Sequence, residues 1–344
     1  MGRKFMFILL FVLVGSHAWA MSCSDIRHPG EGLTDQVYLS KPTFQISKAS
    51  CVNRHRVSEK EMETWLDQYG EDVLPWAEVN GVRFVEESSA RLGLYSMLTL
   101  QKSTRGEGVK VKGQEVILMA PDIPFYFKPN CKKVLCAIKE VFGAQVGLRL
   151  AYMLARFNMN GSHLRYPNAS PFTVAELDEV LMALQDIPTE FLPITQDMQL
   201  TRLTRGKTVE LGGHPCTLAD NQIRLYDLWE IAASDVKRET LIHEVAHALS
   251  DHQFHNIELK PEWLGLSQWI HREGTSLNTS RGANRQEFVS DYAMSSPRED
   301  FAESFTAYIY EPQLLLRQNP AKFQFLKDVI FKGRDFLSIN SCRR

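Results

Sequence analysis

The segment 243–247, with the sequence HEVAH, constrains the fold of this chain more than any other feature. On a helix, residues four apart lie on one face, with about 5–6 Å between their Cβ atoms. The imidazoles of His243 and His247 at that spacing can bind one tetrahedral Zn²⁺, and Glu244 can reach a water at the metal without being a ligand. We therefore expect a helix over about 236–251 that buries one side and presents the histidines on another. Its apolar stripe consists of Leu241, Ile242, Val245, Ala246 and Leu249.

A catalytic zinc needs a third protein ligand and one open position. The metzincin extension requires Gly at 250 and His at 253, and the chain has Ser250 and Gln253 there, which excludes that class. His252 and His255 lie at or just beyond the expected helix end, where histidines are usually solvated. The better candidate is Glu299, near the start of a later helix.

Glu299 and Glu303 are two carboxylates one turn apart, in a helix that we expect to begin at Ser296-Pro297. In the gluzincin arrangement, the first such carboxylate ligates zinc and the second orients a histidine ligand. Two alternatives stay open: Glu299 completes a capping box with Ser296 and binds no metal, or Glu303 is the ligand instead. The packed character of this helix favours a charged partner for Glu303, because a buried carboxylate needs one.

Two segments resemble the catalytic domain of the anthrax lethal factor family. The segment 291–305 (DYAMSSPREDFAESF) has a tyrosine seven residues before a glutamate, followed by E-x-F-A-E-x-F, and 319–328 (NPAKFQFLKD) resembles the final helix of that family. The resemblance covers 170–335 in layout and does not cover 21–160. It implies an α+β fold with a zincin-like metallopeptidase domain, in which a helix, a small sheet and the HExxH helix precede a mainly helical lobe.

The same resemblance implies a role for each matching side chain. These are the zinc ligands His243, His247 and Glu299, the general base Glu244, the transition-state donor Tyr292 and the supporting carboxylate Glu303. Tyr292 has a simpler alternative, since a tyrosine beside an active site is often a packing residue. Asp300 departs from the family, which often has an aromatic or apolar residue at that position, and it adds a negative charge near the site.

Residues 1–20 (MGRKFMFILLFVLVGSHAWA) are typical of a secretory signal peptide. Arg3 and Lys4 precede ten apolar residues, and Ala18-Trp19-Ala20 provides a cleavage site. The apolar run is too short to span a bilayer, although an uncleaved anchor is the alternative. We expect a secreted or periplasmic protein.

Six cysteines follow the predicted cleavage site, and up to three disulfides are compatible with an oxidising compartment. The pairs Cys23–Cys51 and Cys131–Cys136 are hypotheses, because six cysteines allow fifteen pairings. The six are Cys23, Cys51, Cys131, Cys136, Cys216 and Cys342.

The length of 344 residues favours two domains after the signal peptide. We place a mixed α/β N-terminal domain of unknown role over 21–165 and the metallopeptidase domain over 166–344, because 157–172 is rich in Asn, Gly, Ser and Pro. We expect a helix after a capping box at Ser58 and a long amphipathic helix over 134–157 that Gly143 and Gly147 interrupt. Further helices are expected after a capping box at Thr173, after an N-cap at Ser234 or Asp235, and after Ser296-Pro297 and Asn319-Pro320. A strand is expected over 222–231, where an extended substrate could pair with it.

The charge balance gives no reason to expect a polyanionic partner. The chain has 39 Lys and Arg against 41 Asp and Glu, so binding to nucleic acid or to an anionic membrane surface is not expected. No apolar run after the signal peptide approaches twenty uncharged residues, so we expect no stable membrane insertion after signal cleavage. We predict a zinc metalloendopeptidase that acts on a protein or peptide substrate with Zn²⁺ as cofactor. The alternatives are a non-catalytic zincin-fold binding protein and a toxin-like effector with very narrow specificity.

Overall fold

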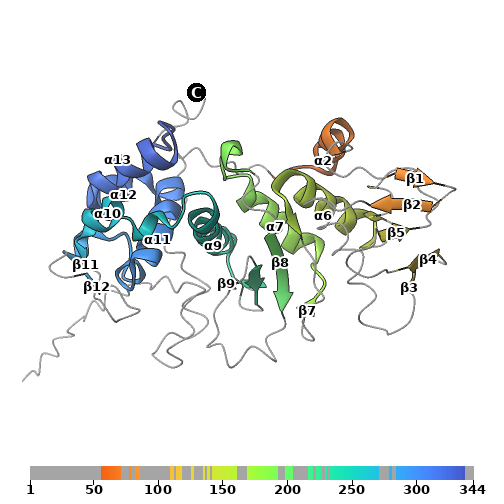
Figure 1. Cartoon of the computed structure of the whole chain (residues 1–344), viewed down its shortest axis with the longest axis horizontal. Helices are drawn as coiled ribbons and strands as arrows, with labels where there is room; N and C mark the ends of the chain where they lie inside the picture. Colours follow the sequence, from red (N-terminus) through yellow and green to blue (C-terminus); the bar gives the residue numbers. More distant parts are fainter. Residues whose placement is uncertain are drawn as a thin grey trace, which may run out of the picture.

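The computed structural model describes residues 56–337, apart from gaps at 71–76, 80–81, 86–108, 112–113, 118–124, 128–134, 136–137, 140–141, 161–168, 193–197, 204–215, 220–221, 227–228, 231, 271–278 and 281–283 (Figure 1). The predicted signal peptide and both predicted cysteine pairs lie outside the described residues. The described part is mostly helical, with short strands in two main sheets. None of its helices has the length and apolar character needed to cross a bilayer.

The first sheet is antiparallel and lies at one end of the long axis in Figure 1. Helix α2 (Glu59–Trp65) and a π-helical turn (Leu66–Gly70) precede it, and the predicted capping box between Ser58 and Glu61 is confirmed. In the order β1-β2-β5-β4-β3, its strands are β1 (Ala77–Val79), β2 (Val82–Val85), β5 (Phe125–Phe127), β4 (Gln114–Ile117) and β3 (Val109–Val111).

The predicted interruption at Gly143 is confirmed, because its φ of +87° breaks a right-handed helix. The described residues before it (Leu135, Ile138, Lys139 and Phe142) are helical, and helix α6 (Ala144–Phe157) begins directly after it. The predicted interruption at Gly147 is wrong, since α6 continues through that residue. A Cβ on Gly147 would lie 2.7 Å from the backbone oxygen of Ile138, so this helix approaches the preceding segment closely only because residue 147 is glycine.

The second sheet places β10 in its interior. Its order is β6-β8-β10-β9, with β7 also paired to β8, and β10 is parallel to β8 and antiparallel to β9. The prediction of a strand over 222–231 is wrong in length, because the strand ends at Leu225 and the backbone oxygen of Tyr226 then accepts from Trp229 N–H at 2.9 Å in a turn. The strands are β6 (Met159–Asn160), β7 (Ala169–Ser170), β8 (Met198–Leu203), β9 (Cys216–Ala219) and β10 (Gln222–Leu225).

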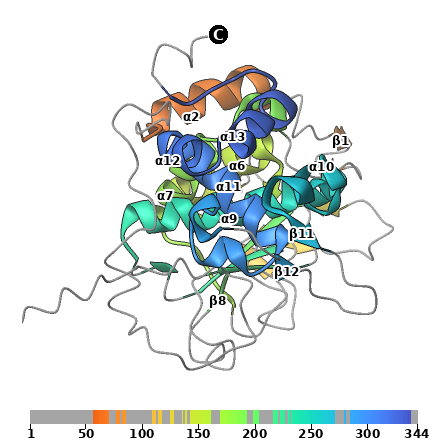
Figure 2. The same ribbon diagram turned by 90° about the vertical axis from the view of Figure 1, so that its left-hand side faces the viewer.

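Helix α9 (Ser234–His252) carries the HExxH segment through the interior of the molecule. It packs against α7 (Val174–Leu184), α11 (Pro297–Tyr310) and β9, so its residues are buried on all sides from Arg238 to Ser250. The expectation that this helix buries only one side is therefore wrong. Figure 2 shows α9 and α11 side by side, with β8 below them.

The start of α9 also differs from the predicted N-cap. Ala233 occupies the cap position without a side-chain hydrogen bond, and the Ser234 hydroxyl instead donates to Glu179 Oε2 of α7 at 2.6 Å. Tertiary contact with α7 thus replaces a local cap.

Helices α9 and α11 run antiparallel: an ion pair joins them directly at one end, and Asp186, which follows α7, connects them at the other. Near the end of α9, Asp251 accepts two hydrogen bonds of 2.8 Å from Arg298 at the start of α11. Near the start of α9, Arg238 pairs with Asp186, which also accepts from Tyr310 at the end of α11 at 2.8 Å. We call these the exposed clamp and the buried clamp, since the Arg298 side chain is 40% exposed and that of Arg238 is 3% exposed.

Three short helices, α10 (Pro261–Leu264), α12 (Pro312–Gln318) and α13 (Pro320–Phe325), lie on the other side of α11. A proline occupies the first turn of each of them and of α11 as well. The predicted caps at Ser296 and Asn319, and the predicted capping box at Thr173, are confirmed. An aromatic core fills the space between these helices, formed by Phe191, Phe254, Trp263, Phe301, Phe305, Tyr308, Phe323 and Phe331.

The predicted domain boundary at 165/166 stays a prediction. Helix α6 and strand β6 precede it in sequence, yet α6 packs against α7 and β6 pairs with β8. The residues that support α9 therefore include part of the segment before that boundary.

Candidate metal centre

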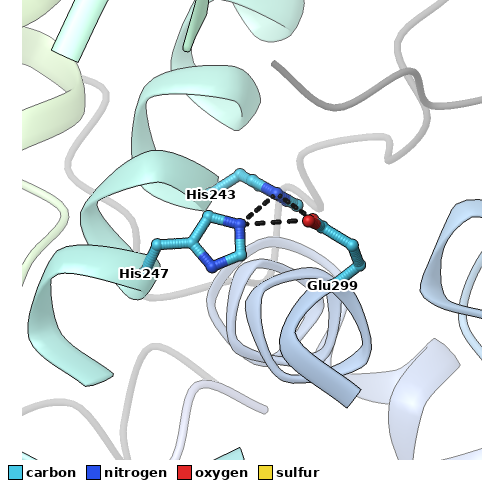
Figure 3. Close-up of side chains that lie close together, drawn as sticks. All are labelled: His243, His247 and Glu299. Atoms are coloured by element: carbon cyan, nitrogen blue, oxygen red, sulfur yellow. Dashed lines mark hydrogen bonds and ion pairs between the residues drawn. The ribbon is translucent and has the colours of Figure 1, made fainter. Parts of the chain in front are cut away.

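Three side chains converge from two helices (Figure 3). His243 Nε2 and His247 Nε2, both on α9, lie 3.0 Å apart. Glu299 Oε2 on α11 lies 3.0 Å from the first and 3.2 Å from the second. Among the described residues, these three form the one group of His, Cys, Asp or Glu side chains whose atoms lie close enough together to hold a metal ion.

The spacing of these atoms suits zinc. Ligand atoms about 2.0–2.1 Å from one tetrahedral Zn²⁺ lie about 3.3 Å from one another, close to the three distances found here. Each atom offers a lone pair to the same small volume, and all three side chains are at least 90% buried. Buried lone pairs at this distance repel one another unless a proton or a cation lies between them. A single metal ion would satisfy all three at once, so the donor set fits a metal.

Glu303 supports the first histidine. Its Oε1 lies 2.9 Å from His243 Nδ1, one turn along α11 from Glu299. A carboxylate that accepts from Nδ1 favours the tautomer whose Nε2 lone pair is available to a metal.

The pKa shifts of His243 and Glu299 favour positive charge at the centre of the site. Burial lowers the pKa of His243, but hydrogen bonds with Glu299 and Glu303 outweigh it and raise this pKa to about 10. Burial alone would raise the pKa of Glu299, yet the neighbouring His247 and His243 hold it well below its usual range. The pKa of His247 is lowered, mainly by burial.

Asp300 does not add its charge to the site. It is fully buried and accepts from Lys322 Nζ at 2.5 Å and from Trp269 Nε1 at 2.9 Å. Lys322 Nζ also lies 4.3 Å from the centre of the Phe288 ring. The negative charge that distinguishes this chain from the lethal factor pattern is therefore neutralised by a buried cation.

The two predicted reaction residues lie next to His243, the first of the three candidate ligands. Glu244 follows His243 on α9 and is fully buried. Tyr292 lies in a 3₁₀ turn (Tyr292–Met294) before α11, and its ring centre is 6.0 Å from that of His243. Their chemical roles stay predictions.

The alternative candidates lie elsewhere. His252 and His255 are exposed, as expected, and neither belongs to the cluster. Ser296 caps α11 by accepting from Glu299 N–H at 3.2 Å, but the Glu299 carboxylate faces the histidines. The alternative in which Glu299 serves only its own helix start therefore does not account for its position.

Sequence reasoning missed several residues that hold the site. Ser290, Arg298 and Lys322 each contact a carboxylate on α9 or α11. The partners are Glu303, Asp251 and Asp300, which lie 13, 47 and 22 residues away in sequence. No local pattern marks such pairs, because they depend on how the helices pack.

Comparison with known families places the same region in a chemical class. Residues 216–322 match the family model described as "Putative zinc-binding metallo-peptidase". This region is similar to zinc-binding metallopeptidases. No curated protein and no solved structure matches the chain.

The matched range begins at β9 and ends in α13, so it includes both histidines, Glu299 and the buried Lys322. The prediction of Zn²⁺ as cofactor agrees with this match, and so does the prediction of a protein or peptide substrate.

Proposed function

We propose that this protein is a zinc metalloendopeptidase of the gluzincin type, with His243, His247 and Glu299 as zinc ligands. The convergence of these side chains within 3.2 Å of one another carries the proposal. Three protein ligands leave a fourth tetrahedral position for water, which is the arrangement of catalytic rather than structural zinc sites. We further propose that the domain is of the lethal factor type, on the sequence pattern from Tyr292 to Glu303.

In this proposal, each residue has one task. Zinc, when bound, supplies Lewis-acid chemistry by activating water and polarising the scissile carbonyl. Glu244 accepts a proton from the attacking water and delivers it to the leaving amine. The Tyr292 hydroxyl donates to the oxygen on which negative charge develops. Glu303 holds the His243 ring in orientation.

The sheet offers a different strand for substrate than the sequence suggested. Strand β10 pairs on both sides, so it has no free edge for a peptide. In the described part of the sheet, β9 is the last strand in the order and contacts α9. We propose that an extended peptide pairs with β9, since an edge strand presents unpaired backbone groups.

The amino-terminal segment supports a proposal on location. We propose that 1–20 is removed during export and that the mature protein acts outside the cytoplasm, in the periplasm or after secretion. Cysteine pairing would then follow export.

The substitution Glu244→Gln tests the enzymatic assignment. We expect zinc content to stay near one ion per chain and peptide turnover to fall by about 10²–10⁴-fold, because the amide cannot accept the proton. Glu239→Gln is the matched control, since Glu239 is a buried carboxylate five residues earlier on α9. Turnover by Glu244→Gln equal to that of the parent would show that the base is another residue.

A digest of a broad peptide library by the parent protein, with and without a chelator, separates the classes of function. Cleavage that the chelator abolishes supports the enzyme. Zinc binding without any cleavage would instead favour a binding protein or an effector with very narrow specificity.

A further inference from the structure

Ser290 connects two parts of the candidate site that are separate in sequence. Its hydroxyl donates to Glu303 Oε2 at 2.6 Å and accepts from Ala293 N–H at 3.0 Å. Ala293 belongs to the 3₁₀ turn that carries Tyr292. The other carboxylate oxygen of Glu303 lies on His243 Nδ1.

Glu303 therefore uses one oxygen for the histidine and the other for Ser290. A carboxylate held at both oxygens cannot rotate without breaking a hydrogen bond, so the Ser290 contact fixes the orientation that Glu303 presents to His243. The same hydroxyl holds the backbone of the turn. A displacement of the turn is thus transmitted through Ser290 and Glu303 to the imidazole.

We propose that Ser290 is a positioning residue that couples the Tyr292 turn to His243 through Glu303. It sets both the orientation of a metal ligand and the place of the proposed oxyanion donor. The effect on Tyr292 rests on the proposed function, since the position of Tyr292 matters only if peptide is cleaved. The first part of the proposal, the effect on His243, concerns metal binding alone and stands without any enzymatic activity.

The test compares two substitutions in the full mature chain. We expect Ser290→Ala to weaken Zn²⁺ binding by about tenfold, the lower end of what partners of metal ligands contribute. Ser290→Thr keeps a hydroxyl and should restore affinity to within twofold of the parent. Affinity is measured by competition with a chromophoric chelator, and the visible spectrum of the Co²⁺-loaded protein reports ligand geometry.

Ser304→Ala provides a matched control. Ser304 is a buried serine on α11 next to Glu303, and its hydroxyl faces Asp300 at 3.4 Å. Its removal should leave Zn²⁺ affinity and the Co²⁺ spectrum unchanged. Thermal unfolding of the chelator-treated variants shows whether any loss of affinity merely follows a loss of fold.

A double-mutant cycle shows whether Ser290 acts through Glu303. In a Glu303→Ala background, Ser290→Ala should change Zn²⁺ affinity by less than twofold, because the connection is already lost. An equal loss in both backgrounds would overturn the proposal, and so would a Ser290→Ala protein with parental affinity and spectrum.

If the protein cleaves peptide, Ser290→Ala should lower kcat more than it raises KM, because oxyanion donation acts in the transition state. A change in KM alone would contradict the role assigned to the Tyr292 turn. A protein that binds zinc but cleaves nothing would remove the proposed function, while the effect on Zn²⁺ affinity would still decide the first part.

Discussion

Glu299 and Glu303 lie one helical turn apart on α11 and contact different atoms of the histidines. Glu299 lies against the Nε2 atoms of both histidines, whereas Glu303 contacts the Nδ1 atom of His243 and neither Nε2 atom. A side chain in contact with the shared centre and one behind a ring should contribute differently to metal binding.

We expect Glu299→Ala to lose most bound zinc, because two imidazoles remain as the only protein ligands. Glu303→Ala should retain zinc with an affinity lower by about 10–100-fold, as for other partners of metal-bound histidines. Metal content after dialysis against a graded chelator series measures both. The reverse order of loss would make Glu303 the ligand.

The sequence was sufficient for residues related by helical spacing. His243 and His247, or Glu299 and Glu303, lie four apart, and a helix alone then determines which face they share. Ser290 and Lys322 could not be found in this way. Their partners, Glu303 and Asp300, become neighbours only after α11 has packed against other segments.

At the scale of elements, the relative position of α9 and α11 determines the distance between the ligands. The two clamps fix that position, but their surroundings differ. The Arg238 side chain is 3% exposed and that of its partner Asp186 is fully buried, whereas Arg298 and Asp251 are 40% and 30% exposed. Charges in the interior are far more costly to leave without a partner than charges in water.

We predict that Arg238→Met lowers the free energy of unfolding by about 3 kcal/mol, because Asp186 stays buried without its cation. Arg298→Met should cost less, about 1 kcal/mol, since solvent screens its pair with Asp251 and its contact with the buried Glu258 is longer, at 3.8 Å. Urea unfolding of the two variants gives the comparison. Equal losses would mean that exposure does not separate the two clamps as argued.

Helix starts could be read from the sequence with more success than strands. A helix cap is local: the side chain of Ser, Thr or Asn accepts a hydrogen bond from the backbone N–H three residues later. Thr173, Ser296 and Asn319 all do so. The strand over 222–231 was predicted too long, since β-branched and aromatic residues continue past Leu225 while the backbone turns at Tyr226. Trp229, directly after this turn, is fully buried, and its indole N–H donates to the backbone oxygen of Lys237 at 3.2 Å, contacts that no local sequence pattern specifies.

At the scale of the whole molecule, the proposed signal peptide predicts where the mature chain begins. Expressed in a host with a secretory pathway, the chain should be recovered from the exported fraction with Met21 as its first residue. Edman sequencing or intact mass identifies this terminus. Ala20→Arg should block processing, because the cleavage site requires a small residue there. A parent protein that keeps Met1 and sediments with membranes would favour the uncleaved anchor.

A zinc-binding metallopeptidase could be predicted from sequence because its characteristic residues lie in two short segments, 243–247 and 291–305. The packing of the helices and strands around them could not be predicted in this way. Helix α6 and strand β6 precede the proposed boundary, yet they pack with elements that follow it. Composition marks a polar stretch at 157–172 but carries no information on which strands pair across it.

The ion pair between Asp300 and Lys322 has a consequence for any shortened version of this protein. A chain that stops before α13 would leave a carboxylate enclosed by the rings of Trp269 and its neighbours, one residue from a proposed zinc ligand. Removing α13 would therefore leave a buried carboxylate without its cation next to the candidate metal centre. A shortened protein that keeps this centre intact has to extend beyond Lys322.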